Sequence, residues 1–155
     1  MSAVVCSSEF FCHRAMLCAV LNAISLHRLR IMAAHALGLL RDDRVPGILK
    51  EGLGDRDHRV RGEIASSLGM YNPAIVSEML IDIIKGDRSR YVRSAALYSL
   101  KRLYFRKSLL PLFHIYAEEK DPIFADMLRK VIVDFIGRFV SYEDIPDWDI
   151  RSHYF

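Results

Sequence analysis

The most constraining feature of this 155-residue chain is a pattern that recurs about every 32 residues. Three segments begin alike, with an apolar residue before an arginine, at Arg30, Arg61 and Arg93, and these arginines stand 31 and 32 residues apart. A fourth arginine, Arg129, follows 36 residues later. Repetition at such a period is typical of arrays in which each unit packs on its neighbours. We therefore expect a short repeat array rather than two globular domains.

Counted from each arginine, apolar residues recur at offsets 3, 4, 7 and 10. These offsets trace one face of an α-helix, so each segment predicts an amphipathic first helix. The residues concerned are Ala33, Ala34, Leu37 and Leu40; Ile64, Ala65, Leu68 and Tyr71; Ala96, Leu97, Leu100 and Leu103; and Ile132, Val133, Ile136 and Phe139. Glycine follows at offset 8 in three of them, as Gly38, Gly69 and Gly137, where a missing side chain is expected to allow close helix packing.

A second series of leucines lies between these helices and predicts a second helix in each unit. The series runs Leu17, Leu49, Leu80 and Leu112, with apolar partners four residues later at Leu21, Leu53, Ile84 and Tyr116. Because Leu17 fits the series, the N-terminal stretch is interpreted as part of an incomplete leading unit. No strand pattern competes. The expected fold is all-α, a right-handed α-solenoid of stacked helical hairpins.

The chain resembles HEAT repeats over the segments LRIMAAHALGLLRDDRVPGILKEGLGDRDHRVR and VRGEIASSLGMY. The short bacterial-style variety, also seen in phycobilin lyase subunits, is the most similar. Its pattern, Val-Arg-x-x-Ala-Ala-x-Ala-Leu-Gly, is met nearly in full at Leu29–Gly38, partly at Val60–Gly69 and Val92–Leu100, and loosely at Leu128–Gly137. The resemblance covers about residues 14–140 and implies three and a half to four repeats. It is specific for fold and weak for function.

The domain organisation follows from these periods. Residues 1–140 form the repeat domain, with units at about 1–27 (partial), 28–57, 58–89, 90–123 and 124–140. Residues 141–155 break the pattern, because acidic and apolar residues alternate there and include the sole tryptophan, Trp148. This tail is interpreted either as a cap over the last unit or as an aromatic-acidic segment that docks on a partner.

Repeated charged residues offer a first candidate site. Asp55 with Arg61, and Asp87 with Arg93, could form a catalytic or anion-binding set. A polar group repeated at the fold period more simply serves the repeat itself. These four residues are therefore predicted to form a structural ladder between neighbouring turns, as the resemblance also implies.

Basic residues offer a second candidate site, an edge that could follow a phosphate backbone. Its members are Arg59, Arg90, Arg102 and Arg106. Residues 1–107 carry a net charge of +7 and residues 108–155 a net charge of −4, but the overall +3 is too mild to indicate nucleic acid by itself. Acidic neighbours also dilute the positive field. Nucleic-acid binding therefore stays the alternative function.

Catalytic signals are missing from the sequence, and the chain is predicted not to be an enzyme and to need no cofactor or metal. Histidines do not recur as a ligand set, and the odd number of cysteines, Cys6, Cys12 and Cys18, matches no zinc pattern. A helper subunit in cofactor attachment is a further alternative, implied by the resemblance alone. The N-terminus does not resemble a signal peptide and no apolar run could span a membrane, so a soluble, cytoplasmic protein without membrane insertion is expected.

The preferred interpretation is a non-catalytic adaptor or scaffold that binds another protein within a larger assembly. Its contacts are predicted on the second helices, at positions off the buried series, and on the tail. These positions are Lys50, Glu51, Glu78, Asp82, Lys85, His114, Glu118, Glu119 and Trp148. Self-association through the incomplete N-terminal repeat is a further possibility, because a solenoid end can leave apolar surface open.

Overall fold

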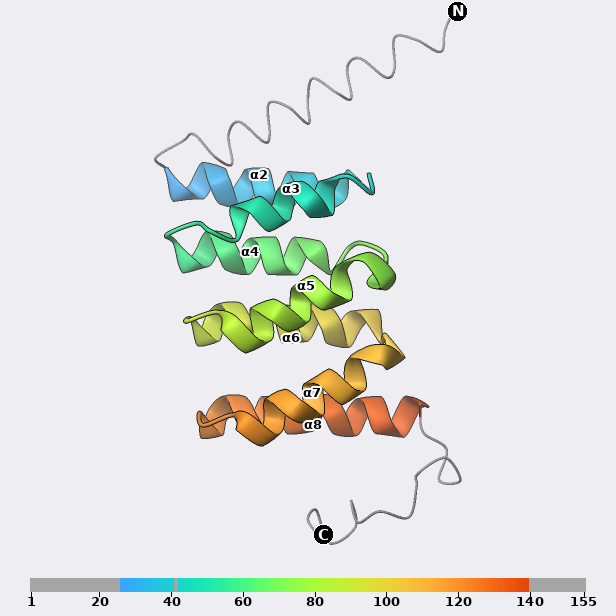
Figure 1. Ribbon diagram of the computed structural model, residues 1–155. Coiled ribbons are helices and arrows are strands. Elements are labelled where there is room, and N and C mark those ends of the chain that lie inside the picture. Colours follow the sequence, from blue (N-terminus) through green and yellow to red (C-terminus); the bar gives the residue numbers. More distant parts are fainter. Residues whose placement is uncertain (1–25, 41, 140–155) are drawn as a thin grey trace, which may run out of the picture.

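The computed structural model describes residues 26–40 and 42–139, and this part of the chain consists of helices joined by short connections (Figure 1). The helices are α2 (His27–Leu39), α3 (Val45–Gly52), α4 (His58–Leu68), α5 (Pro73–Gly86), α6 (Arg90–Leu103), the short 3-10 helix η1 (Arg106–Ser108), α7 (Leu109–Glu118) and α8 (Pro122–Phe139). Within the described residues there is no strand. The predicted all-α solenoid is confirmed.

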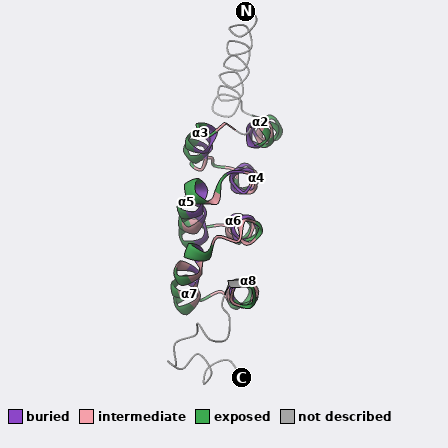
Figure 2. Cartoon of the chain, turned by 90° about the vertical axis from the view of Figure 1, so that its right-hand side faces the viewer, coloured by how far each residue is buried: buried purple, intermediate pink, exposed green. Residues whose placement is uncertain are grey.

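The helices form two layers that alternate along the chain. The first helices α2, α4, α6 and α8 stack in one layer, and the second helices α3, α5 and α7 stack in the other (Figure 2). Each helix contacts the next member of its own layer, and each second helix contacts the first helix that follows it, across the layers. Prolines begin two of these helices, since Pro73 and Pro122 are the first residues of α5 and α8, where no amide donor is lost.

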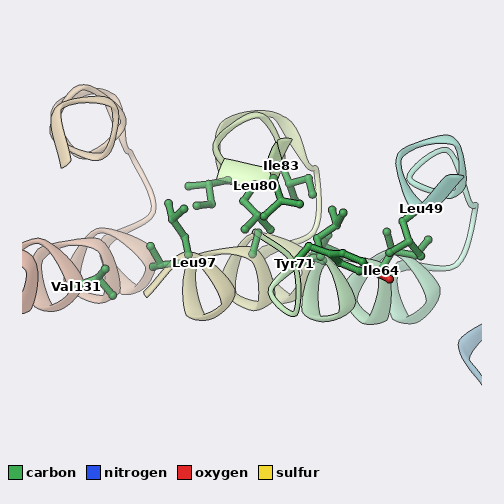
Figure 3. Packing of buried hydrophobic residues seen from close by; sticks show 14 of the residues in the cluster. Leu49, Ile64, Tyr71, Leu80, Ile83, Leu97 and Val131 are labelled. Atoms are coloured by element: carbon green, nitrogen blue, oxygen red, sulfur yellow. The ribbon is translucent and has the colours of Figure 1, made fainter. Parts of the chain in front are cut away.

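The core lies between the two layers and is built by the predicted offsets. In α2, α4 and α6 the residues at offsets 3, 4 and 7 are all buried. From the second layer, Leu49, Leu80 and Leu112 are fully buried. Figure 3 shows Leu49 and Leu80 in this core. Leu17 and Leu21, the first members of the second series, lie outside the described residues.

The predicted alignment of the fourth unit is wrong by about one helical turn. Val133, expected in the core, is 58% exposed, whereas Phe124 and Leu128 are fully buried. The Asp121 side chain accepts hydrogen bonds from the first amides of α8, so this helix begins 32 residues after α6 and aligns Ala125, not Arg129, with Arg93. An apolar face repeats every 3.6 residues, so shifting a helix by four residues still matches most of the pattern.

Two of the three glycines at offset 8 are confirmed as close-packing positions. A Cβ atom added to Gly38 would lie 2.8 Å from the Ser67 Cβ, and one added to Gly69 would lie 2.7 Å from the Ser99 Cβ. These glycines let α2 approach α4, and α4 approach α6. The expectation for Gly137 is wrong, since no atom lies within 4 Å of an added Cβ there. With the corrected alignment, Gly137 no longer occupies offset 8.

Alanine substitutions at Gly38 and Gly137 should therefore change stability in opposite directions. Gly38→Ala should lower the free energy of unfolding by about 1–3 kcal/mol, because the new methyl group overpacks the contact with Ser67. Gly137→Ala should raise it by about 0.5–1 kcal/mol, because alanine is the better helix former and has room. Urea unfolding of both variants measures the two changes. Equal effects would contradict close packing at Gly38.

Candidate interaction surface

Three buried ion pairs connect successive units. Arg30 in α2 binds Asp55 with its Nε and Nη2 atoms at 2.6 and 3.0 Å, and Arg61 in α4 binds Asp87 in the same way at 2.8 and 3.0 Å. Arg93 in α6 binds Glu119. Each arginine thus holds the turn that precedes the first helix of the next unit. These pairs differ from the grouping proposed from the sequence, which combined each aspartate with the arginine six residues later.

Each carboxylate in these pairs also fixes the turn in which it lies. Asp55 accepts a hydrogen bond from the Asp57 amide at 2.8 Å, and Asp87 accepts one from the Ser89 amide at 2.7 Å. Burial alone would raise the pKa of the Asp55 carboxyl, but the hydrogen bonds from Arg30 and the Asp57 amide outweigh it and hold that pKa below its usual value. The pKa of Asp87 is lowered in the same way, by Arg61 and the Ser89 amide.

The ladder leaves little for a ligand to bind. The Arg61 side chain is 5% exposed, and its remaining Nη1 atom donates to the Asp55 carbonyl at 2.8 Å. All three nitrogen atoms of the Arg61 guanidinium therefore donate hydrogen bonds within the fold. The geometry is that of a connection between units, and an incoming anion would have to displace a carboxylate already in place.

The basic edge is also partly neutralised. Arg59 binds Asp57 through Nε and Nη2 at 3.1 and 2.9 Å, and Arg90 binds Asp121 at 3.1 Å. Arg102 and Arg106 are exposed, on α6 and η1. The structure thus does not place four unpaired arginines along one edge, which weakens the case for a phosphate-binding surface.

The second helices carry most of the predicted contact residues on their exposed surface. Lys50, Glu51, Glu78, Asp82, Lys85, His114 and Glu118 are exposed on α3, α5 and α7. Glu119 is not, because its side chain is 9% exposed and accepts the hydrogen bond from Arg93. Trp148 lies outside the described residues. An open depression of about 240 Å³ between α3 and α5, lined by Lys50 and Asp82, is smaller than the roughly 300–1,000 Å³ typical of ligand pockets.

A second surface, which sequence reasoning missed, lies on the outward side of the first helices. We define this first-helix face by the residues at i, i+4, i+7 and i+11 counted from Arg28, Arg59, Tyr91 and Ile123, and none of its sixteen positions is buried. Figure 2 shows exposed residues on the outward sides of both layers. The most exposed apolar residues of this face are Met32, Leu39, Tyr91, Tyr98 and Ile123.

Two tyrosines form the centre of this face, on α6. Tyr91 and Tyr98 are each 57% exposed and stand seven residues apart, so both rings lie on one side of the helix. Tyr91 also leans across α4, where its ring closely covers Gly62 and meets the His58 ring edge-on at 5.8 Å between centroids. The seven-residue spacing of the two tyrosines could be seen in the sequence and places them on one side of a helix. The spacing alone does not tell whether that side faces solvent or the core.

The described residues offer little to other chemistries. Within residues 26–40 and 42–139, no three His, Cys, Asp or Glu side chains gather as metal ligands would. Over the same residues, no helix is both long and apolar enough to cross a membrane.

The two layers and their repeated connections define an α-solenoid, a class of helical repeat protein. The model of the family described as HEAT repeats matches residues 15–101, which is more than half of the chain, so the protein belongs to the HEAT-repeat family. The resemblance noted in the sequence is thereby confirmed. None of the curated proteins matches the chain. HEAT-repeat proteins generally act as protein-interaction scaffolds and are typically non-catalytic.

Proposed function

We propose that this protein is a non-catalytic adaptor that binds a protein partner through the first-helix face. The observation that carries the proposal is the exposed tyrosine pair of α6, flanked by apolar and basic residues of the neighbouring helices. Tyrosine, methionine and arginine are enriched in protein interfaces, and lysine, glutamate and aspartate are depleted. The first-helix face is rich in the residues that interfaces favour, tyrosine, methionine and arginine. The exposed surface of the second helices is rich in the residues that interfaces lack, lysine, glutamate and aspartate.

Charge also distinguishes the two surfaces. The first-helix face carries four basic residues, Arg28, Arg59, Arg102 and Lys130, against two acidic ones, Glu63 and Asp134. Both acidic side chains are engaged, Glu63 by His35 and Asp134 by the Tyr104 hydroxyl. Two of the basic residues are paired as well, Arg59 with Asp57 and Lys130 with Asp126, so Arg28 and Arg102 carry the excess positive charge. The predicted contact residues of the second helices are mostly acidic and lysine side chains, which favour a hydrated surface.

Tyr91 has a further property of an interface anchor, because its ring is held before any partner arrives. Gly62 leaves room for the ring on α4, and His58 borders its edge. An anchor that is already ordered loses less conformational entropy on binding than a mobile side chain does. We therefore place the centre of the partner contact at Tyr91 and Tyr98.

Variants that replace either tyrosine by a charged residue test this proposal. The tagged full chain should capture a protein in near-equal amount from nuclease-treated native extract. Tyr91→Glu and Tyr98→Glu should each weaken that binding by about 2 kcal/mol, roughly 30-fold, because truncating a buried aromatic anchor has effects of this size. Titration of the identified partner against each variant measures the change.

Variants of the second helices are the matched control. Glu78→Lys and Asp82→Lys change exposed residues of α5 and should leave binding within about twofold, because they lie on the other layer. Loss of binding in these variants, with the tyrosine variants unaffected, would move the contact to the second helices. Capture of nucleic acid alone would instead support the basic-edge alternative.

A further inference from the structure

We infer that the first-helix face is the docking site of this chain's own C-terminal segment, residues 141–155, which binds it in cis. Such docking rests on the proposed function, because both use the same face. A protein partner would then reach Tyr91 and Tyr98 by displacing this segment. The segment would act as a built-in competitor that limits which partners bind.

The chemistry of the segment complements that of the face. The segment carries four acidic residues and one arginine, and its apolar residues alternate with the acidic ones. The acidic residues are Glu143, Asp144, Asp147 and Asp149, and the apolar ones include Tyr142, Ile145, Trp148 and Ile150. The face offers the exposed Arg102 beside its aromatic centre, four residues after Tyr98 on α6, so charge and apolar surface would be satisfied together.

The connection point lies close enough for docking. Figure 1 shows α6 and α8 ending on the same side of the molecule, and α8 is the neighbour of α6 in the first layer. Helix packing distances of about 9 Å and a rise of 1.5 Å per residue place Tyr98 roughly 17 Å and Tyr91 roughly 26 Å from the end of α8. The nine residues 140–148 can span up to about 30 Å, so Trp148 can reach either ring.

The end of the solenoid, by contrast, gives the segment little reason to bind there. The side of α8 that continues the stack carries Asp126, Arg129 and Val133. Asp126 is paired with Arg129 and with Lys130, both at 2.6 Å, and α6 has the buried Leu97 where α8 has Arg129. A polar outer side is typical of a terminal unit that needs no apolar cover. The first-helix face is therefore the better site for an apolar segment.

Tethering favours the intramolecular complex over binding to another molecule. A tether of a few residues gives an effective concentration on the order of millimolar, so even a weak contact is populated in cis. Attraction between opposite charges on an exposed face also makes the contact sensitive to salt.

The sole tryptophan reports docking directly, so the experiment uses the full chain without a label. Selectively excited Trp148 emission should be blue-shifted and less quenched by acrylamide than in the synthetic peptide of residues 141–155. Tyr98→Ser should move both readings toward those of the free peptide, and so should Arg102→Glu, which keeps the ring and reverses a charge. Emission of the wild-type chain that equals that of the peptide would overturn the inference.

Two controls separate docking on this face from other sources of burial. Leu110→Ser removes a comparably exposed residue, 64% exposed on α7, and should leave the emission unchanged. Circular dichroism should be the same for all variants. A blue shift that survives both Tyr98→Ser and Arg102→Glu would place the segment elsewhere, and a red shift on dilution would show binding between copies; either result overturns docking in cis. Because these readings need no partner, they can fail while the partner contact at Tyr91 and Tyr98 still holds.

Discussion

Replacing Arg61 by alanine should lower the free energy of unfolding by about 3–5 kcal/mol, one of the two largest single effects expected in this protein. Arg61 binds Asp87 at two points and also donates to the Asp55 carbonyl. The Asp87 side chain is 12% exposed, so the substitution would leave a nearly buried carboxylate without its counter-ion. Urea unfolding at neutral pH, followed by circular dichroism, measures the loss.

Arg59→Ala is the matched control two residues away. The Arg59 side chain is 53% exposed and its partner Asp57 lies in the same turn, so this variant should lose less than about 1 kcal/mol. The double variant Arg61→Met with Asp87→Leu should recover part of the stability lost in Arg61→Ala, because no unpaired charge remains. The recovery is incomplete because the Ser89 amide and the Asp55 carbonyl still lose their side-chain partners. Equal losses in Arg61→Ala and Arg59→Ala would show that the ladder does not stabilise the stack.

The sequence predicted the helices and most of the core because their signal is local. Offsets of 3, 4 and 7 report which side of a helix is apolar, and burial of Ala33, Ile64 and Ala96 follows from that alone. The four residues assigned to the ladder were found in the same way, by their period. Their pairing was not, because it depends on how one unit sits on the next. Asp55 is six residues from Arg61, yet it pairs with Arg30, 25 residues away.

The outward surface was harder to predict for a different reason. Burial requires apolar residues at fixed positions in every unit, whereas a binding surface has no such requirement. Tyr91 and Tyr98 occupy positions where α4 has Arg59 and Ser66, so no periodic comparison reveals them. Only their exposure in the structure separates them from equally apolar residues in the core, and this exposure makes them candidates for the partner contact. The sequence analysis instead predicted the partner contacts at charged residues of the second helices, because these residues lie off the buried leucine series.

Phe124→Ala should also lower the free energy of unfolding by about 3–5 kcal/mol, the usual range for removing a fully buried phenylalanine. Its ring fills the core between α6 and α8, and the Arg93 guanidinium lies over it at 4.2 Å from the centroid. The substitution would therefore leave a cavity and remove the support of the arginine that binds Glu119. Chemical unfolding gives the total loss, and a cycle with Arg93→Ala should show coupling of about 0.5–2 kcal/mol between the two residues.

Neighbouring exposed residues decide whether the alignment of α8 is correct. Ile123→Ala and Val133→Ala change residues that are each 58% exposed, so both should lie within about 0.5 kcal/mol of the wild type. If the offsets of the fourth unit started at Arg129, as the sequence pattern predicts, Val133 would be a core residue and its truncation would be the costly one. The corrected alignment instead makes Phe124 the core residue, because Asp121 fixes the start of α8 and Phe124 follows three residues later. A large loss at Val133 with a small loss at Phe124 would restore the original alignment, and with it an extra turn between the third and fourth units.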